Sequence, residues 1–143
     1  MSLGLPKNIF SLVLLSSLVL AACRAPLQPQ ADAKPEIITT VGMIADVAEN
    51  VAGPCVTVTA LMGPGTDPHT YKASARDSRT LGSADLILYS GFGLEGEFGD
   101  LLGRIGERRP TLAVAEGAIP RAETIRTDNA YGVDPHVWMD AAS

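Results

Sequence analysis

Both histidines of this 143-residue chain follow the same dipeptide, Asp-Pro. His69 lies two residues after Asp67, and His136 lies two residues after Asp134. A neutral imidazole offers one nitrogen lone pair to a divalent metal ion, and the proline restricts the backbone just before each ring. We therefore predict that His69 and His136 bind a divalent metal ion. Asp67 and Asp134 are predicted to cap the two turns or to support the ligands by hydrogen bonds from behind.

Two imidazoles alone would form an incomplete metal site. Taken singly, either histidine could instead be a surface or packing residue, and it is the shared context that favours metal binding. Zinc commonly takes four ligands, and manganese usually takes more. Cys55 stands at the entry to an expected strand, where we predict a small buried side chain. The alternative is a thiolate ligand near His69, which would favour zinc.

Short apolar runs alternate with helical patterns from residue 36 onward, which is typical of βα units on a parallel sheet. Ser74 and Asp77 have the spacing of a capping box, and Arg76, Asp77 and Arg79 are expected on a solvated face of the helix that follows. Strands are expected at 36–40, 56–61, 85–90 and 111–115, helices at 43–52, 74–83 and 97–106, and irregular structure at 117–133. The fold class is thus α/β, a parallel sheet with flanking helices. His69 should lie beyond the carboxyl end of a strand, where ligands bind in open α/β sheets.

The first 22 residues have the pattern of a targeting segment. Lys7 precedes an apolar run at 9–22 that is too short for a comfortable membrane span. The run ends in Leu-Ala-Ala-Cys at 20–23, which resembles the lipobox of bacterial lipoproteins and implies a lipid on Cys23. An ordinary signal peptide with a chance cysteine is the alternative. We predict a signal peptide at 1–22, a tether with three prolines at 23–35, and one α/β lobe at 36–143 outside the cytoplasm.

Charge excludes one class of partner. The chain has 11 basic and 16 acidic residues, and removing 1–22 takes away only Lys7, which leaves 10 basic against 16 acidic side chains. Phosphate binding needs a basic footprint that this chain lacks, so nucleic acid is excluded as a partner.

Four segments, taken together, resemble the manganese/zinc solute-binding proteins of ABC importers. They are residues 39–46, 63–71, 84–89 and 134–140. The resemblance implies a lipoprotein, held at the membrane through Cys23, that captures Mn²⁺ or Zn²⁺ between two α/β lobes. It further implies delivery of the metal to an ABC permease and its ATPase. In that family the two motifs supply the first two ligands, which places the role on His69 and His136.

The sequence ends at Ser143, just after the second motif. The resemblance implies a third ligand, His or Glu, and a fourth, Asp, from a second lobe, so this chain is expected to be the amino-terminal half and to bind metal weakly alone. Zinc-specific members often carry a His-rich insertion before the second motif. Residues 121–133 contain no histidine, which favours manganese or broad Mn/Zn binding.

Two functions of other classes compete with metal transport. A surface adhesin or interaction lipoprotein could bind metal without transporting it. A metallohydrolase would need an open metal position and a general base, and the chain has no His-Glu-x-x-His cluster. Glu95, Glu97 or Asp140 could serve as the base, but each is expected to be a loop or helix-surface acid.

Overall fold

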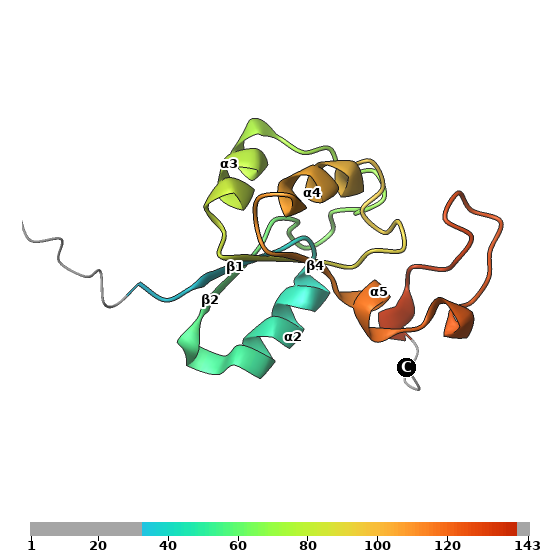
Figure 1. Cartoon of the computed structure of the whole chain (residues 1–143), viewed down its shortest axis with the longest axis horizontal. Coiled ribbons are helices and arrows are strands. Elements are labelled where there is room, and N and C mark those ends of the chain that lie inside the picture. Colours follow the sequence, from blue (N-terminus) through green and yellow to red (C-terminus); the bar gives the residue numbers. More distant parts are fainter. Residues whose placement is uncertain (1–32, 140–143) are drawn as a thin grey trace, which may run out of the picture. The chain divides into compact units, whose positions relative to one another are not determined.

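The computed structural model describes residues 33–139, which form a four-stranded sheet with helices on both faces (Figure 1). The predicted leader, Cys23 and Asp140 lie outside the described residues. The elements in chain order are β1 (Glu36–Thr39), α2 (Gly42–Ala52), η1 (Gly53–Cys55), β2 (Thr57–Ala60), α3 (Ala75–Ser83), β3 (Leu86–Tyr89), α4 (Phe98–Gly106), β4 (Thr111–Ala113), α5 (Val114–Ala118), η2 (Arg121–Glu123) and η3 (Val137–Met139).

The sheet has the order β2-β1-β3-β4, and every neighbouring pair is parallel. This confirms the predicted fold class. The chain moves outward from β1 to β2 and then crosses back to β3 on the other side of β1, so the winding reverses between the two central strands. In such sheets the carboxyl edge at the reversal is the usual place for a ligand.

The main core lies between the sheet and the helices α3 and α4, which cover one face (Figure 1). Buried side chains of the strands meet buried side chains of those helices there. The cluster comprises Ile38, Val41, Met62, Leu81, Ala84, Ile87, Leu94, Phe98 and Leu102.

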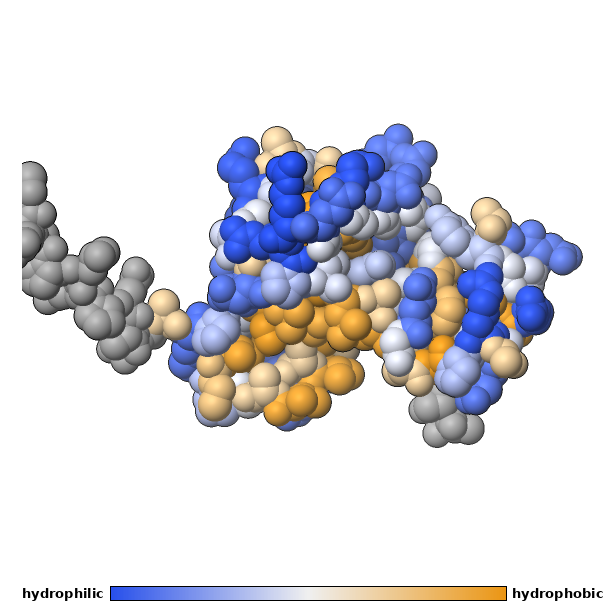
Figure 2. Space-filling view, viewed as in Figure 1, coloured by the Kyte–Doolittle hydropathy of each residue, from blue (hydrophilic) through white to orange (hydrophobic). Residues whose placement is uncertain are grey.

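The other face of the sheet is covered less completely. Helix α2 packs there through Ala45 and Ala48, but Val47 is 60% exposed and Val51 is 82% exposed. Leu112 of β4 is also half exposed, and Figure 2 shows apolar surface gathered over this side of the molecule. The apolar periodicity of 43–52 therefore predicts the helix correctly, while only part of its apolar stripe is covered by residues 33–139.

The prediction of a strand at 111–115 is wrong at the carboxyl end. β4 stops at Ala113, and Val114 begins the short helix α5. The amide of Ala115 donates to the carbonyl of Ser90 over 3.0 Å, which turns the chain across the end of β3. Residues 117–133, expected to be irregular, include the end of α5, the turn η2 and an antiparallel bridge between Arg126 and Val133.

Cys55 is exposed, so the prediction of a buried side chain is wrong. It ends the turn η1, two residues before β2 begins, while His69 lies beyond the other end of that strand. Strand β2 separates the two residues, so the thiol lies at the opposite edge of the sheet from the imidazole. Within residues 33–139, no helix is long and apolar enough to cross a membrane.

The predicted capping box of α3 is confirmed. The amide of Asp77 donates to Oγ of Ser74 over 3.2 Å, and the amide of Ser74 donates to the Asp77 carboxylate over 2.7 Å. Tyr71 also donates its hydroxyl to this carboxylate over 2.8 Å. Asp77 is 8% exposed, which corrects the expectation that it lies on a solvated face with Arg76 and Arg79. Burial on its own would raise the pKa of Asp77, but hydrogen bonds from Ser74 and Tyr71 outweigh it and hold the pKa below the ordinary value.

We predict that Asp77→Ala lowers the free energy of unfolding by about 1–3 kcal/mol at pH 7, because the partly buried hydrogen bonds from Ser74 and Tyr71 lose their acceptor. A lowered pKa in the folded state stabilises the fold above the unfolded pKa of about 4, and this contribution disappears as pH falls through the folded pKa. Urea unfolding should therefore show a smaller difference in the free energy of unfolding between wild type and Asp77→Ala at pH 3 than at pH 7. The control is Arg79→Ala on the exposed face, and equal stability of Asp77→Ala and wild type at pH 7 would contradict the assignment.

Candidate metal centre

The two Asp-Pro-His segments fold with the same local hydrogen bond. The amide of His69 donates to Oδ1 of Asp67 over 3.0 Å, and the amide of His136 donates to Oδ1 of Asp134 over 2.9 Å. An aspartate that accepts from the amide two residues on makes a tight local turn. Each aspartate therefore fixes the backbone that carries its histidine. This is the first of the two roles expected from the sequence, the capping of the turn.

Both carboxyls are held ionised by these contacts. The amide of His69, followed by the Thr70 hydroxyl at 2.9 Å, lowers the pKa of Asp67. The amide of His136, followed by the His136 ring, lowers the pKa of Asp134. Each aspartate is thus a hydrogen-bond acceptor over the whole physiological range of pH.

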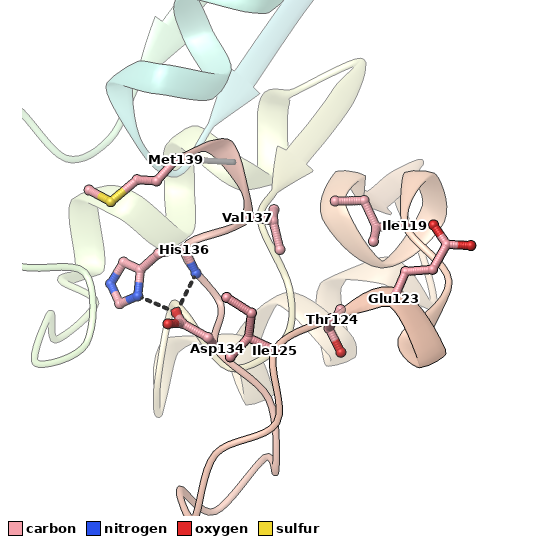
Figure 3. A pocket seen from close by; sticks show the side chains of 8 residues that line it. All are labelled: Ile119, Glu123, Thr124, Ile125, Asp134, His136, Val137 and Met139. Carbon is pink, nitrogen blue, oxygen red and sulfur yellow. Dashed lines mark hydrogen bonds and ion pairs between the residues drawn. The ribbon is translucent and has the colours of Figure 1, made fainter. Parts of the chain in front are cut away.

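Each aspartate accepts a second hydrogen bond, and the donor of that bond differs between the two segments. Nδ1 of His136 lies 2.6 Å from Oδ1 of Asp134, as Figure 3 shows. Because the ionised carboxylate can only accept, Nδ1 of His136 carries the proton and its Nε2 carries the lone pair. In the segment of His69, the second oxygen of Asp67 accepts from Thr70 instead of from the ring.

The structure brings the two predicted ligands together. Nε2 of His69 lies 3.3 Å from Nε2 of His136, and the ring centroids are 5.3 Å apart at an interplanar angle of 64°. Two imidazoles bound to one zinc ion at about 2.0–2.1 Å in tetrahedral geometry have their nitrogens roughly 3.3–3.4 Å apart. The observed separation therefore fits one metal ion shared by both rings.

Among residues 33–139 no third His, Cys, Asp or Glu joins the pair as a further ligand. Asp134 touches Nδ1 of His136, on the side of the ring away from the shared Nε2 position. His69 is exposed, and the His136 side chain keeps 40% of its surface accessible. The two nitrogens thus form one side of a coordination shell that is open to additional ligands.

The segment before His136 is anchored by Val133, which is fully buried against Phe92 and Ala115. The amide of Asp134 donates to the carbonyl of Ile125 over 2.8 Å. Beside this anchor lies a pocket of about 340 Å³, drawn in Figure 3. It is lined by Ile119, Glu123, Thr124, Ile125, Asp134, His136, Val137 and Met139.

Trp138 packs its ring against His136, with centroids 5.3 Å apart and an interplanar angle of 63°. The two rings meet in a T-shaped contact, while Nε2 of His136 lies toward His69. Spacing alone could not assign this role, because Trp138 is two residues from the ligand and 40% exposed.

Glu95, expected to be a surface acid, is 1% exposed. Its carboxylate accepts from the hydroxyl of Thr40 and from the amides of Ser90 and Gly91. The loop that it closes, 90–96, is formed largely of turns, and it passes beside the backbone of His69. The one sequence signal for this contact is the position of Glu95 in a glycine-rich loop immediately after β3.

Fold and site together define a class of protein: a doubly wound α/β domain with two imidazoles at the carboxyl side of its parallel sheet, suited to a divalent metal ion. The sequence model of the family described as "Zinc-uptake complex component A periplasmic" matches residues 37–143. The chain belongs to this family.

Named relatives bind different metals. The chain is 44% identical over 134 residues to the manganese-binding lipoprotein MntA of Bacillus subtilis (strain 168), covering 93% of the chain and 44% of MntA. It is 46% identical over 110 residues to the zinc-binding protein TroA of Treponema pallidum (strain Nichols), covering 77% of the chain and 35% of TroA. The solved structure of periplasmic zinc-binding TroA superposes with a TM-score of 0.71 at 45% identity, covering 76% of this chain and 38% of that one.

The chain therefore spans less than half the length of these relatives. The family model runs from residue 37 to residue 143, so the matched region contains both Asp-Pro-His segments and all of the sheet except Glu36, the first residue of β1.

We predict that the metal-free histidines occupy two different tautomers. His136 should be protonated on Nδ1 by its bond to Asp134, and its Nε2 should accept a hydrogen bond from a proton on Nε2 of His69. Long-range ¹⁵N–¹H NMR above pH 8 distinguishes the two ring nitrogens of each residue.

The control is Asp134→Ala, which should abolish the preference of His136 for Nδ1–H while leaving the fold intact. Finding the His136 proton on Nε2 in the wild type would contradict the assignment. Metal capture requires a lone pair on both Nε2 atoms, so the His69 proton must then move to Nδ1.

Proposed function

We propose that this protein captures Mn²⁺ or Zn²⁺ outside the cytoplasm and delivers it to an ABC permease driven by its ATPase. The observation that carries the proposal is the 3.3 Å separation of the two Nε2 atoms in a chain that belongs to a metal-uptake family. His69 and His136 are the proposed ligands. Asp134 is proposed to orient His136, and Asp67 to hold the turn that presents His69.

Further ligands are proposed to come from the region that the longer relatives possess and that this chain does not match. Two neutral imidazoles supply no negative charge to a dication, so additional His, Glu or Asp ligands would complete the shell, and the carboxylates among them would offset its charge. The printed names of the relatives describe metal binding, and the family name describes zinc uptake. These names favour metal transport over metal-dependent hydrolysis. The alternative of a surface adhesin stays a prediction.

We predict that the purified chain binds Zn²⁺ with micromolar or weaker affinity, since only two protein ligands gather within residues 33–139. His69→Ala and His136→Ala should each weaken binding at least tenfold, because a single remaining imidazole lacks the advantage of two ligands that bind the same ion together. Isothermal titration calorimetry measures the affinity, and sedimentation velocity establishes that the sample is monomeric.

Cys55→Ala is the matched control, because Cys55 is the one cysteine among the described residues, and an exposed thiol is a strong alternative ligand for zinc. Its removal should leave zinc affinity unchanged. Submicromolar affinity in a monomer, or unchanged affinity in both histidine variants, would contradict the proposed ligands.

The proposed location at a membrane depends on Cys23. The lipobox-like segment 20–23 and the relative named as a lipoprotein support an acylated amino terminus, with residues 24–35 as a spacer. We predict that the full chain, expressed in a bacterium, fractionates with the membrane and incorporates labelled palmitate. Cys23→Ala should remove the label and release the protein, whereas Cys55→Ala should not, and labelling that survives Cys23→Ala would refute the anchor.

A further inference from the structure

Glu95 ties together the exits of the two central strands. Its Oε1 accepts from the hydroxyl of Thr40 over 2.8 Å and from the amide of Ser90 over 2.6 Å, while Oε2 accepts from the amide of Gly91 over 3.1 Å. Thr40 directly follows β1, and Ser90 directly follows β3. The side chain therefore bridges the edge of the sheet at the point where the winding reverses.

Burial of this carboxylate needs such donors, because an acidic group without partners is costly inside a protein. The three contacts all come from N–H or O–H groups, and no Lys or Arg forms an ion pair with it among the described residues. Glu95 is thus held by neutral hydrogen-bond donors, and it joins the loop 90–96 to the residues that follow β1 and β3.

The loop held by Glu95 lies against the segment of the first histidine. A Cβ atom placed on Gly96 would lie 2.5 Å from the carbonyl oxygen of His69, closer than such contacts allow. Two residues further along each segment, the ring of Tyr71 packs on Phe98 with centroids 5.5 Å apart. The backbone of His69 therefore rests directly on the carboxyl end of this loop.

The other end of the same loop lies against the segment of the second histidine. Phe92 packs with Val133 and Val137, the residues on either side of the Asp134–His136 turn. The Glu116 carboxylate accepts from the amide of Phe92 over 2.6 Å and fixes this end of the loop to α5. The ring of Tyr131 lies where a side chain on Gly93 would have to sit.

We propose that the loop 90–96 sets the separation of His69 and His136, and that Glu95 and Gly96 are positioning residues for metal capture. The inference rests on the proposed function, because the loop affects metal binding only through the positions of the two histidines. It requires no contact between Glu95 and the ion. The loop touches both ligand segments, and Glu95 fixes it to the residues that follow β1 and β3.

The sharpest test compares two glycines that both have positive φ. Gly96 has φ of +50° and abuts His69, whereas Gly53 has φ of +58° and ψ of −145°, lies at the end of α2 and has open space around its missing side chain. Both substitutions to Ala strain the backbone, and the conformation of Gly53 is one that alanine rarely adopts, but Gly96→Ala alone pushes on a ligand segment.

Gly96→Ala should weaken Zn²⁺ binding at least tenfold in calorimetry and change the ¹⁵N signals of the His69 ring in the metal-free chain. Gly53→Ala should leave both at wild-type values although its unfolding midpoint falls. Equal zinc affinities and equal His69 signals in the two variants would overturn the proposal.

A second variant keeps the test decisive if Gly96→Ala fails to fold. Glu95→Gln preserves the volume and the oxygen that faces Thr40 and Ser90, but it sets an amide N–H₂ against the N–H of Gly91. We expect the same loss of affinity and the same change at His69, and a wild-type result would overturn the proposal. Failure of the wild type to bind Zn²⁺ would refute the proposed function, while the metal-free His69 signals would still test the positioning role.

Discussion

The structure depends on one buried carboxylate at the carboxyl edge of its sheet. Glu95 is almost completely enclosed, and its three donors come from the residues at which β1 and β3 end. Parallel strands have no tight turn that joins their neighbouring ends. Here the amide of Thr40 donates to the carbonyl of Leu88 over 3.1 Å, and Glu95 adds side-chain hydrogen bonds just beyond it, while the glycines of the loop around Glu95 let the chain approach Glu116 and Tyr131 closely.

This carboxylate also explains where the two histidines lie. The crevice at the reversal of a doubly wound sheet usually receives the ligand, because loops diverge there. In this protein Glu95 occupies the space between the exits of β1 and β3, and the two histidines follow the strands on either side of that pair. His69 follows β2 and His136 follows β4 and α5, which places the Nε2 pair on loops from the two outer strands.

Sequence patterns predicted those features that depend on local chemistry. The α/β alternation, the capping box at Ser74 and the pairing of His69 with His136 each follow from periodicity, spacing or a repeated tripeptide. Burial of Glu95 was missed because one donor, the Thr40 hydroxyl, lies 55 residues away in sequence. The exposure of Cys55 was missed for a related reason, since a turn at the amino edge of a sheet looks in sequence like the start of a strand.

The chemistry of the donor atoms indicates which metal ion is preferred, independently of the names of the relatives. Both imidazoles present nitrogen, and nitrogen ligands favour zinc over manganese because affinity rises along the first transition row. The absence of histidine from residues 121–133 favours manganese by resemblance, so the two lines of argument oppose each other. They are reconciled if selectivity lies in the remaining ligands: carboxylate oxygens and a higher coordination number would suit manganese, whereas another imidazole in a tight four-coordinate shell would suit zinc. On this reasoning His69 and His136 provide a common platform for either ion, and substitutions in residues 33–139 should change affinity for both metals together.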